Sequence, residues 1–293
     1  MNSRFYLSLI FFLLSHTLNA LAVPSVVVSI KPIHSIVSSL MQSVGEPQLL
    51  LENNNSAHNF HIRPSQVKAL ENAELIISIN SKFEAGLANI LSNYSNSTRI
   101  VISELNLPNI YTSRENDHQD KEIEYDYHLW LDINNARSIA KQLSYRLIEI
   151  DATNASTYSS NFDKLDAKLL QLNKDNSEQL AGLEATNFAN YSDTLQYFEK
   201  NHNLKQPIIV TPYHGARLSI RDVLNAKKKM QKQQTKCLFH TNEINFEKTN
   251  VITEDTSIIR AEISILGNEF ESGPDQYFNL MTNLTSQIAQ CLQ

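Results

Sequence analysis

The sequence predicts an α/β protein made of two βα lobes with mostly parallel sheets, joined by one long helix. Short β-branched runs alternate with amphipathic segments in the first half of the chain, and the same alternation returns in the second half. Between the halves, residues 153–181 contain neither Gly nor Pro, and their apolar residues step by three and four. An apolar content of 42% with 19% charged residues fits a packed globular protein.

The first half begins with a strand at residues 26–30, whose apolar, β-branched residues suit a buried position. A helix that has Pro32 in its first turn follows it. Further strands are expected at 48–51, 75–79 and 99–103, with helices at 64–72 and through Phe83, Leu87 and Ile90. Residues 112–127 are polar and acidic, typical of a surface loop. A strand at 128–132 then leads into a long helical region.

The second half repeats this order. Strands are expected at residues 207–211, 236–239, 250–253 and 258–265, and helices at 194–201, 218–232 and 276–292. The joining helix would be about 38 Å long, enough to run from one lobe to the other. We therefore divide the chain into an N-terminal lobe (23–152), a linking helix (153–181) and a C-terminal lobe (182–293).

Residues 1–22 resemble a secretory signal peptide. Arg4 supplies an early positive charge, residues 6–14 are apolar, and Ala20-Leu21-Ala22 has the small-x-small pattern that signal peptidase accepts. The apolar run is shorter than the roughly 20 residues that span a bilayer, although an uncleaved anchor is the alternative. We expect cleavage after Ala22 and an exported protein.

Composition argues against several functions. There are 25 Lys plus Arg and 31 Asp plus Glu, so a net charge of −6 offers no general attraction to nucleic acid. The six glycines form neither a dinucleotide-binding nor a P-loop pattern. No nucleophile elbow and no H-E-x-x-H motif occurs, so nothing in the sequence indicates an enzyme.

The two cysteines, Cys237 and Cys291, agree with export, because an even pair in an oxidising compartment is usually bridged. We expect one disulfide, with two buried free thiols as the alternative. Their spacing excludes a C-x-x-C redox or zinc motif.

Histidines at strand ends are the best candidates for binding chemistry. His58 lies in an Asn-rich loop after the second strand, and His128 begins the strand at 128–132. Ligands bind at such ends in parallel α/β sheets, although either histidine alone would more often be a surface or packing residue. His34 and His202 are expected to be exposed to solvent.

Three segments carry a family resemblance: residues 26–37, residues 56–66 around His58, and His128-Leu129-Trp130-Leu131-Asp132. Together they resemble ZnuA-type proteins, the periplasmic zinc-binding components of high-affinity zinc ABC importers. The resemblance extends over nearly the whole chain after residue 22, including the linking helix and the two cysteines.

This resemblance implies a Zn²⁺ ion in the cleft between the lobes, held by three histidines and a fourth oxygen ligand or water. His58 matches the first family histidine and His128 the second. Ser192 stands where the third histidine is usual, and Ser264 stands where manganese-binding relatives have an acidic ligand. A neutral hydroxyl is a poor zinc ligand, so these two positions predict a weakened affinity for the metal.

Four residues are candidates to replace the missing ligand. Asp193 is adjacent to the altered position, although it could instead cap the helix beginning at Thr194. His61 follows His58 by three residues, and His214 and His240 follow strands of the second lobe.

We therefore expect a monomeric periplasmic substrate-binding protein that captures a divalent metal, first of all Zn²⁺, and docks on a membrane permease without performing chemistry. The alternative is a paralogue with a degenerate metal site that acts as an accessory or interaction protein, a weak zinc carrier. A metal-dependent hydrolase ranks last, because it would need an open coordination position and a general base, and no such set of residues can be named.

Overall fold

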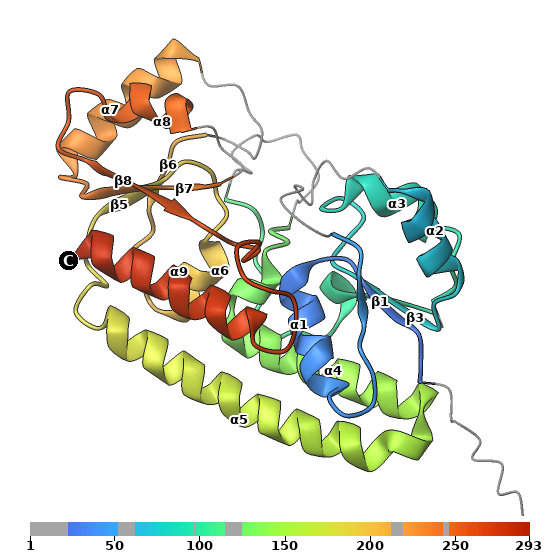
Figure 1. Ribbon diagram of the computed structural model, residues 1–293. Helices are drawn as coiled ribbons and strands as arrows, with labels where there is room; N and C mark the ends of the chain where they lie inside the picture. Colours follow the sequence, from blue (N-terminus) through green and yellow to red (C-terminus); the bar gives the residue numbers. More distant parts are fainter. Residues whose placement is uncertain (1–22, 52–61, 97, 115–124, 212–218, 243–245) are drawn as a thin grey trace, which may run out of the picture.

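The computed structural model describes residues 23–51, 62–96, 98–114, 125–211, 219–242 and 246–293. Two βα lobes stand side by side, and one long helix runs beneath both (Figure 1). This confirms the predicted fold class. The signal-like segment and three candidate ligands, His58, His61 and His214, lie outside the described residues. No helix in the described part of the chain combines the length and apolarity needed to cross a bilayer.

The part of the chain before the long helix, which we call the N-lobe, contains a four-stranded parallel sheet of order β2-β1-β3-β4. Its central strand β1 is buried throughout and pairs with β3 through Val27 and Ile76. The strands are β1 (Val26–Val28), β2 (Gln48–Leu49), β3 (Leu75–Ser78) and β4 (Arg99–Val101), with α1 (Lys31–Leu40), α2 (Pro64–Glu71) and α3 (Ala85–Leu91) between them.

The part after the long helix, the C-lobe, has a second parallel sheet of order β6-β5-β7-β8. Its strands are β5 (Phe188–Asn190), β6 (Ile208–Ile209), β7 (Cys237–Thr241) and β8 (Ile259–Ile263). Its helices are α6 (Gln196–Asn201), α7 (Ile220–Lys232), α8 (Phe246–Thr253) and α9 (Gln276–Leu292). The second sheet therefore repeats the strand order of the first.

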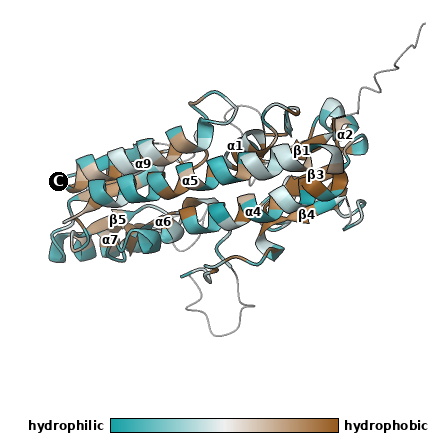
Figure 2. Cartoon of the chain, turned by 90° about the horizontal axis from the view of Figure 1, so that it is seen from below, coloured by the Kyte–Doolittle hydropathy of each residue, from teal (hydrophilic) through white to brown (hydrophobic). Residues whose placement is uncertain are grey.

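Two helices connect the lobes. Helix α4 (Ile133–Ile150) leads into α5 (Ala155–Leu180), whose 26 residues span about 39 Å. Figure 2 shows α4, α5 and α9 lying alongside one another, with largely hydrophilic residues on the outer side of α5. The amide of Asn161 on α5 donates to the carbonyls of Leu40 and Gln42, which ties the end of α1 to the linking helix.

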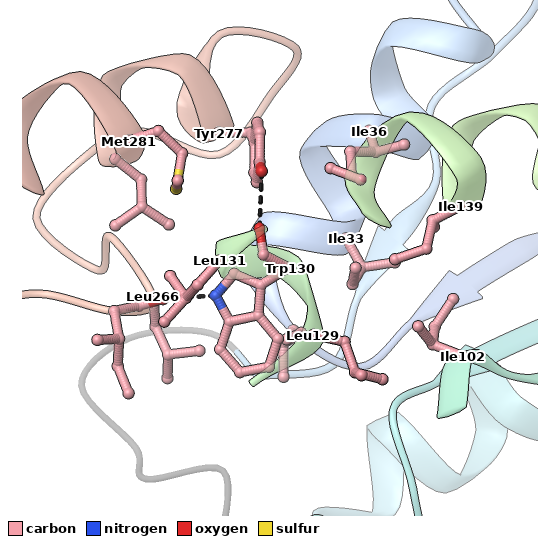
Figure 3. Close-up of a cluster of buried hydrophobic side chains, with 14 of the residues drawn as sticks. Ile33, Ile36, Ile102, Leu129, Trp130, Leu131, Ile139, Leu266, Tyr277 and Met281 are labelled. Carbon is pink, nitrogen blue, oxygen red and sulfur yellow. Dashed lines mark hydrogen bonds between the residues drawn. The ribbon is translucent and has the colours of Figure 1, made fainter. Parts of the chain in front are cut away.

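The larger hydrophobic core extends across both lobes, because one cluster of buried side chains includes residues of both sheets and of α5. A second, smaller cluster lies within the C-lobe. At the centre of the larger core Trp130 is fully buried, and its indole N–H donates to the carbonyl of Ile265 in the C-lobe at 2.7 Å (Figure 3). On the same side, Lys31 donates to the carbonyls of Asn268 and Phe270. The lobes are therefore packed together along their inner faces.

The predicted disulfide is confirmed. Cys237 in β7 and Cys291 in α9 are bonded, and their Cα atoms are 6.1 Å apart. Because both residues belong to the C-lobe, the bridge ties the last helix to a central strand of its own sheet. Closing a loop of this length restricts the unfolded chain by about 4 kcal/mol in the entropic account.

The strand predicted at 128–132 is wrong: Leu129–Leu131 form a short 3-10 helix, η3. The amide of Leu131 donates to the carbonyl of His128 at 3.1 Å, and the Asp132 carboxylate caps α4 by accepting from the amide of Asn134. Apolar composition suggested a strand here, but these side chains are buried because they fill the space between the lobes.

Two other assignments were also wrong. Residues 250–253, predicted as a strand from their β-branched residues, form the end of α8, where Ile252 is buried and Val251 is exposed, as on one turn of an amphipathic helix. The central strand β5 was missed because Phe188–Asn190 is only three residues long and contains no β-branched residue.

Candidate functional site

His128 lies at the inner edge of the N-lobe, where the chain enters η3. The side chain is buried, with 6% of the residue exposed. Its ring meets the Phe83 ring edge to face, with centroids 5.5 Å apart, and lies 5.6 Å from the ring of Trp130. These aromatic neighbours restrict the rotation of the imidazole.

Asp126, which was not among the predicted site residues, orients the imidazole of His128. Its Oδ1 atom accepts from Nδ1 of His128 at 2.8 Å and from the His128 backbone amide at 2.9 Å. A carboxylate oxygen accepts from a ring N–H, so Nδ1 of His128 carries a proton in this hydrogen bond. A carboxylate behind an imidazole is the arrangement that orients metal-ligating histidines.

A buried glutamate, Glu84, lies next to Phe83 in the chain and holds the backbone there. The carboxylate of Glu84 accepts from the backbone amides of Ile79 and Asn80, where β3 ends, at 2.8 and 3.3 Å. Burial raises its pKa to about 7, against the lowering influence of these hydrogen bonds and of Ser29. Since Glu84 follows Phe83 in the chain, it fixes the backbone that presents the Phe83 ring to His128.

The two serines at altered ligand positions are both buried in the C-lobe. Ser264 caps a turn: its hydroxyl donates to Glu269 at 2.9 Å and accepts from the amide of Gly267 at 3.0 Å. Ser192 follows β5, and its carbonyl accepts from the amide of Thr194. Neither side chain supplies the imidazole or carboxylate that zinc prefers.

Asp193, the nearest candidate replacement, is held by a cation. The guanidinium of Arg114 in the N-lobe binds both carboxylate oxygens of Asp193, and its Nη1 atom donates to Glu199 at 2.7 Å. The second oxygen of Glu199 accepts from Asn190 at 2.7 Å. Arg114 and Glu199 line a cavity of about 420 Å³. Asp193 therefore takes part in an ion pair across the lobes rather than in a helix cap.

Burial and ion pairing together shift the pKa values of Glu199 and Arg114. The Glu199 side chain is 2% exposed, and burial raises its pKa to about 7 even though Arg114 works in the opposite direction. Burial would lower the pKa of Arg114, but its hydrogen bonds and charge interactions with the two carboxylates outweigh this and raise it. The guanidinium is thus permanently charged, while Glu199 ionises near neutral pH.

His240 lies within β7 rather than after it and is 2% exposed. Its Nδ1 atom is 3.3 Å from the carbonyl of Thr241, and burial lowers its pKa. The imidazole is therefore neutral at physiological pH, as a metal ligand must be. Within the described ranges, no three His, Cys, Asp or Glu side chains gather closely enough to hold a metal ion.

The expectation that His34 and His202 are exposed was wrong, since both are buried. Nε2 of His34 lies 2.9 Å from the carbonyl of Pro47. His202 packs against Phe198 with ring centroids 4.6 Å apart, and burial lowers its pKa to about 4. Both histidines are therefore part of the packed interior.

Comparisons with known proteins agree with this architecture. The sequence model of the ZnuA family, described as zinc-uptake complex component A, periplasmic, matches residues 26–291. The high-affinity zinc uptake system protein ZnuA of Brucella abortus (strain 2308) is 25% identical over 304 residues, covering 91% of each chain. Similar proteins of this description occur in Yersinia pestis, at 23% identity and with 93% of this chain and 92% of that protein covered.

Among solved structures, a crystal structure of ZnuA aligns with a TM-score of 0.80 at 18% identity, covering 93% of this chain and 100% of the other. The substrate-binding protein FpvC of Pseudomonas aeruginosa, solved with Mn²⁺, aligns with a TM-score of 0.81 at 14% identity, covering 93% and 99%. These alignments show that the two-lobed fold is shared.

Proposed function

Because the chain belongs to the ZnuA family of periplasmic zinc-uptake components, a family of substrate-binding proteins and not of enzymes, we propose that it captures Zn²⁺ and delivers it to an ABC importer. The metal is cargo here rather than a resident cofactor. The observation that carries this proposal is the His128–Asp126 pair, in which a buried carboxylate orients an imidazole as metal-ligating histidines are oriented.

We propose that His58 and His128 are the two histidine ligands. The surroundings of His128 suit this role, because Asp126 orients the imidazole and the rings of Phe83 and Trp130 pack against it. His58 follows β2 in the sequence, and β2 pairs in parallel with β1, so the carboxyl end of β2 lies at the same sheet edge as those of β1 and β3.

The third ligand is proposed to come from Asp193, His61, His214 or His240. Asp193 would have to release Arg114 before it could bind a metal, which makes it a conditional ligand. An Asp193→Asn variant separates the possibilities, with Glu199→Gln as the matched control in the same ion cluster. Zinc affinity that falls only in the Asp193 variant would select the carboxylate, and equal affinities would select one of the histidines.

Imidazole ligands favour zinc over harder cations, which prefer oxygen. The site is expected to bind Zn²⁺ more tightly than Mn²⁺ as long as histidines supply most of the ligands. Competition between the two ions in a chelator-buffered titration measures this preference directly.

We propose that residues 1–22 direct export to the periplasm and are removed there, and that the loaded monomer docks on the permease through the tips of both lobes. The Cys237–Cys291 disulfide supports an oxidising compartment. N-terminal sequencing of protein recovered from the periplasm tests the cleavage site after Ala22.

Two measurements test the function as a whole. Elemental analysis of protein purified from the periplasm should find close to one zinc per chain. Expression of the protein, together with its own permease genes, should restore growth of a zinc-importer deletion strain under chelation, and a His128→Ala variant should not. A metal-free protein that fails to restore growth would refute the importer role.

One alternative has an observation in its favour. Ser192 and Ser264 give the C-lobe no strong ligand at the usual positions, and Arg114 already neutralises Asp193. A degenerate site of this kind would suit an accessory protein or weak zinc carrier. Zinc bound only weakly and exchanged directly with a partner protein would favour this alternative.

A further inference from the structure

His128 is flanked by two backbone carbonyls that bind hydroxyl groups of the opposite lobe. The hydroxyl of Tyr197 donates to the carbonyl of Asp126 at 2.9 Å, and the hydroxyl of Tyr277 donates to the carbonyl of Trp130 at 2.7 Å. Figure 3 shows the second of these bonds. The two acceptors lie two residues before and two residues after the histidine.

Both tyrosines belong to the C-lobe, Tyr197 to α6 and Tyr277 to α9, whereas His128 belongs to the N-lobe. Their exposed fractions are 0% and 1%. A phenolic hydroxyl buried to this degree must find a partner within the protein, because an unsatisfied polar group is costly. The bonds to residues 126 and 130 are therefore required by the packing of the two rings.

Tyr197 also forms a hydrogen bond with a second segment of the N-lobe. Its hydroxyl accepts from the backbone amide of Tyr111 at 3.1 Å. The neighbouring Gln196 donates to the carbonyl of Thr112 at 3.0 Å, and its amide lies 3.4 Å from Oδ2 of Asp126. Helix α6 thus contacts the segments before and after residues 115–124 and the carboxylate that orients the imidazole.

We propose that Tyr197 and Tyr277 are positioning residues for His128, through which the C-lobe fixes the metal-binding imidazole of the N-lobe. This inference rests on the proposed function, because it concerns the same site. It explains how a C-lobe that has Ser192 at the usual ligand position can still influence the bound metal: the coupling runs through backbone carbonyls rather than through a coordinating side chain.

Tyr to Phe substitutions test this proposal because they remove only the hydroxyl and keep the packed ring. Tyr158→Phe is the matched control. Tyr158 is equally buried, but it lies in α5 rather than at the lobe contact. Its hydroxyl donates to Asp151 at 2.9 Å. The variants are Tyr197→Phe, Tyr277→Phe, their combination and Tyr158→Phe, each made in the full exported chain.

Two readouts separate positioning from general stability. Long-range ¹H–¹⁵N spectra at pH 8, without metal, should show His128 as the single Nδ1–H tautomer in the wild type and the control, and as a mixture in the site variants. Zn²⁺ affinity from chelator competition should fall about 10-fold in each site variant, the effect typical of losing a group that orients a ligand. Affinity in Tyr158→Phe should stay within about twofold of the wild type.

Unchanged zinc affinity and an unchanged His128 tautomer in the double variant would overturn the proposal, even if its thermal stability fell. A wild type that binds no zinc would refute the proposed function instead, and the tautomer spectrum would still decide whether the tyrosines position His128. If the double variant does not fold, the two single variants give the same comparison with the control.

Discussion

Nδ1 of His128 and Oδ1 of Asp126 are 2.8 Å apart, and only one residue separates the two in the chain. The same oxygen also accepts from the His128 backbone amide, so the carboxylate closes a small ring with the residue that it orients. This local geometry orients the imidazole as metal-ligating histidines are oriented.

Replacing Asp126 with Asn should weaken Zn²⁺ binding. The amide removes the negative charge that stabilises the Nδ1–H tautomer, and the loss of such a partner typically lowers metal affinity about 10- to 100-fold. Chelator competition measures the change. Asp166→Asn, which alters a half-exposed ion pair with Arg137, should leave the affinity unaltered.

Replacing Arg114 with Gln should destabilise the fold, because Asp193 and Glu199 would remain buried without their cation. The loss is expected to be about 3–5 kcal/mol at pH 8. It should be smaller at pH 5, where Glu199, with a pKa of about 7, is protonated. Urea unfolding at both pH values measures this.

The matched control for this experiment is Arg137→Gln. Arg137 and Asp166 form a comparable pair with exposed side-chain fractions of 31% and 30%. Solvent screens that pair, so the change should be within about 1 kcal/mol and nearly independent of pH. Equal losses in the two variants would show that Arg114 is no more important than a surface residue.

Glu84 should make the protein less stable as the pH rises. Below pH 4.5 the carboxyl is protonated in both states; between about 4.5 and 7 it ionises only in the unfolded chain, which then binds fewer protons than the folded one. The loss should reach about 3 kcal/mol above pH 7. Glu84→Gln should remove this slope in urea unfolding, whereas exposed Glu149→Gln should not.

His202, unlike Glu84, should make the protein less stable as the pH falls. With a pKa of about 4 in the folded protein and 6.5 in the unfolded chain, it favours unfolding as the pH falls from 6.5 to 4, because only the unfolded state takes up the proton. A His202→Gln variant should lose stability at pH 7 but resist further loss on acidification. If the variant lost as much stability as the wild type between pH 6.5 and 4, this assignment would be refuted.

Periodicity predicted the long elements well. The last helix was expected at 276–292 and is α9 (Gln276–Leu292), and the linking helix was expected within two residues of its observed ends. Both have unbroken apolar stripes and no Gly or Pro. Strand β5 was missed, because its three residues are too few to show a period. The segments at 128–132 and 250–253 were assigned to strands although they are helical.

The site was predicted only in part. His128 stood out because it begins an apolar run, but Asp126, Tyr197 and Tyr277 did not. A D-x-H spacing is the one local pattern that could have indicated Asp126. The two tyrosines reach residues 126 and 130 only after the lobes pack, at sequence separations of 71 and 147. No local pattern could have revealed them.

Isothermal titration of Zn²⁺ into the wild type and into a His58→Ala/His128→Ala double variant tests the central assignment most directly. The wild type should bind one equivalent tightly, and the double variant should give no heat beyond dilution while retaining its circular dichroism spectrum. Zinc bound by the folded double variant with the affinity of the wild type would contradict the assignment of these two imidazoles as ligands.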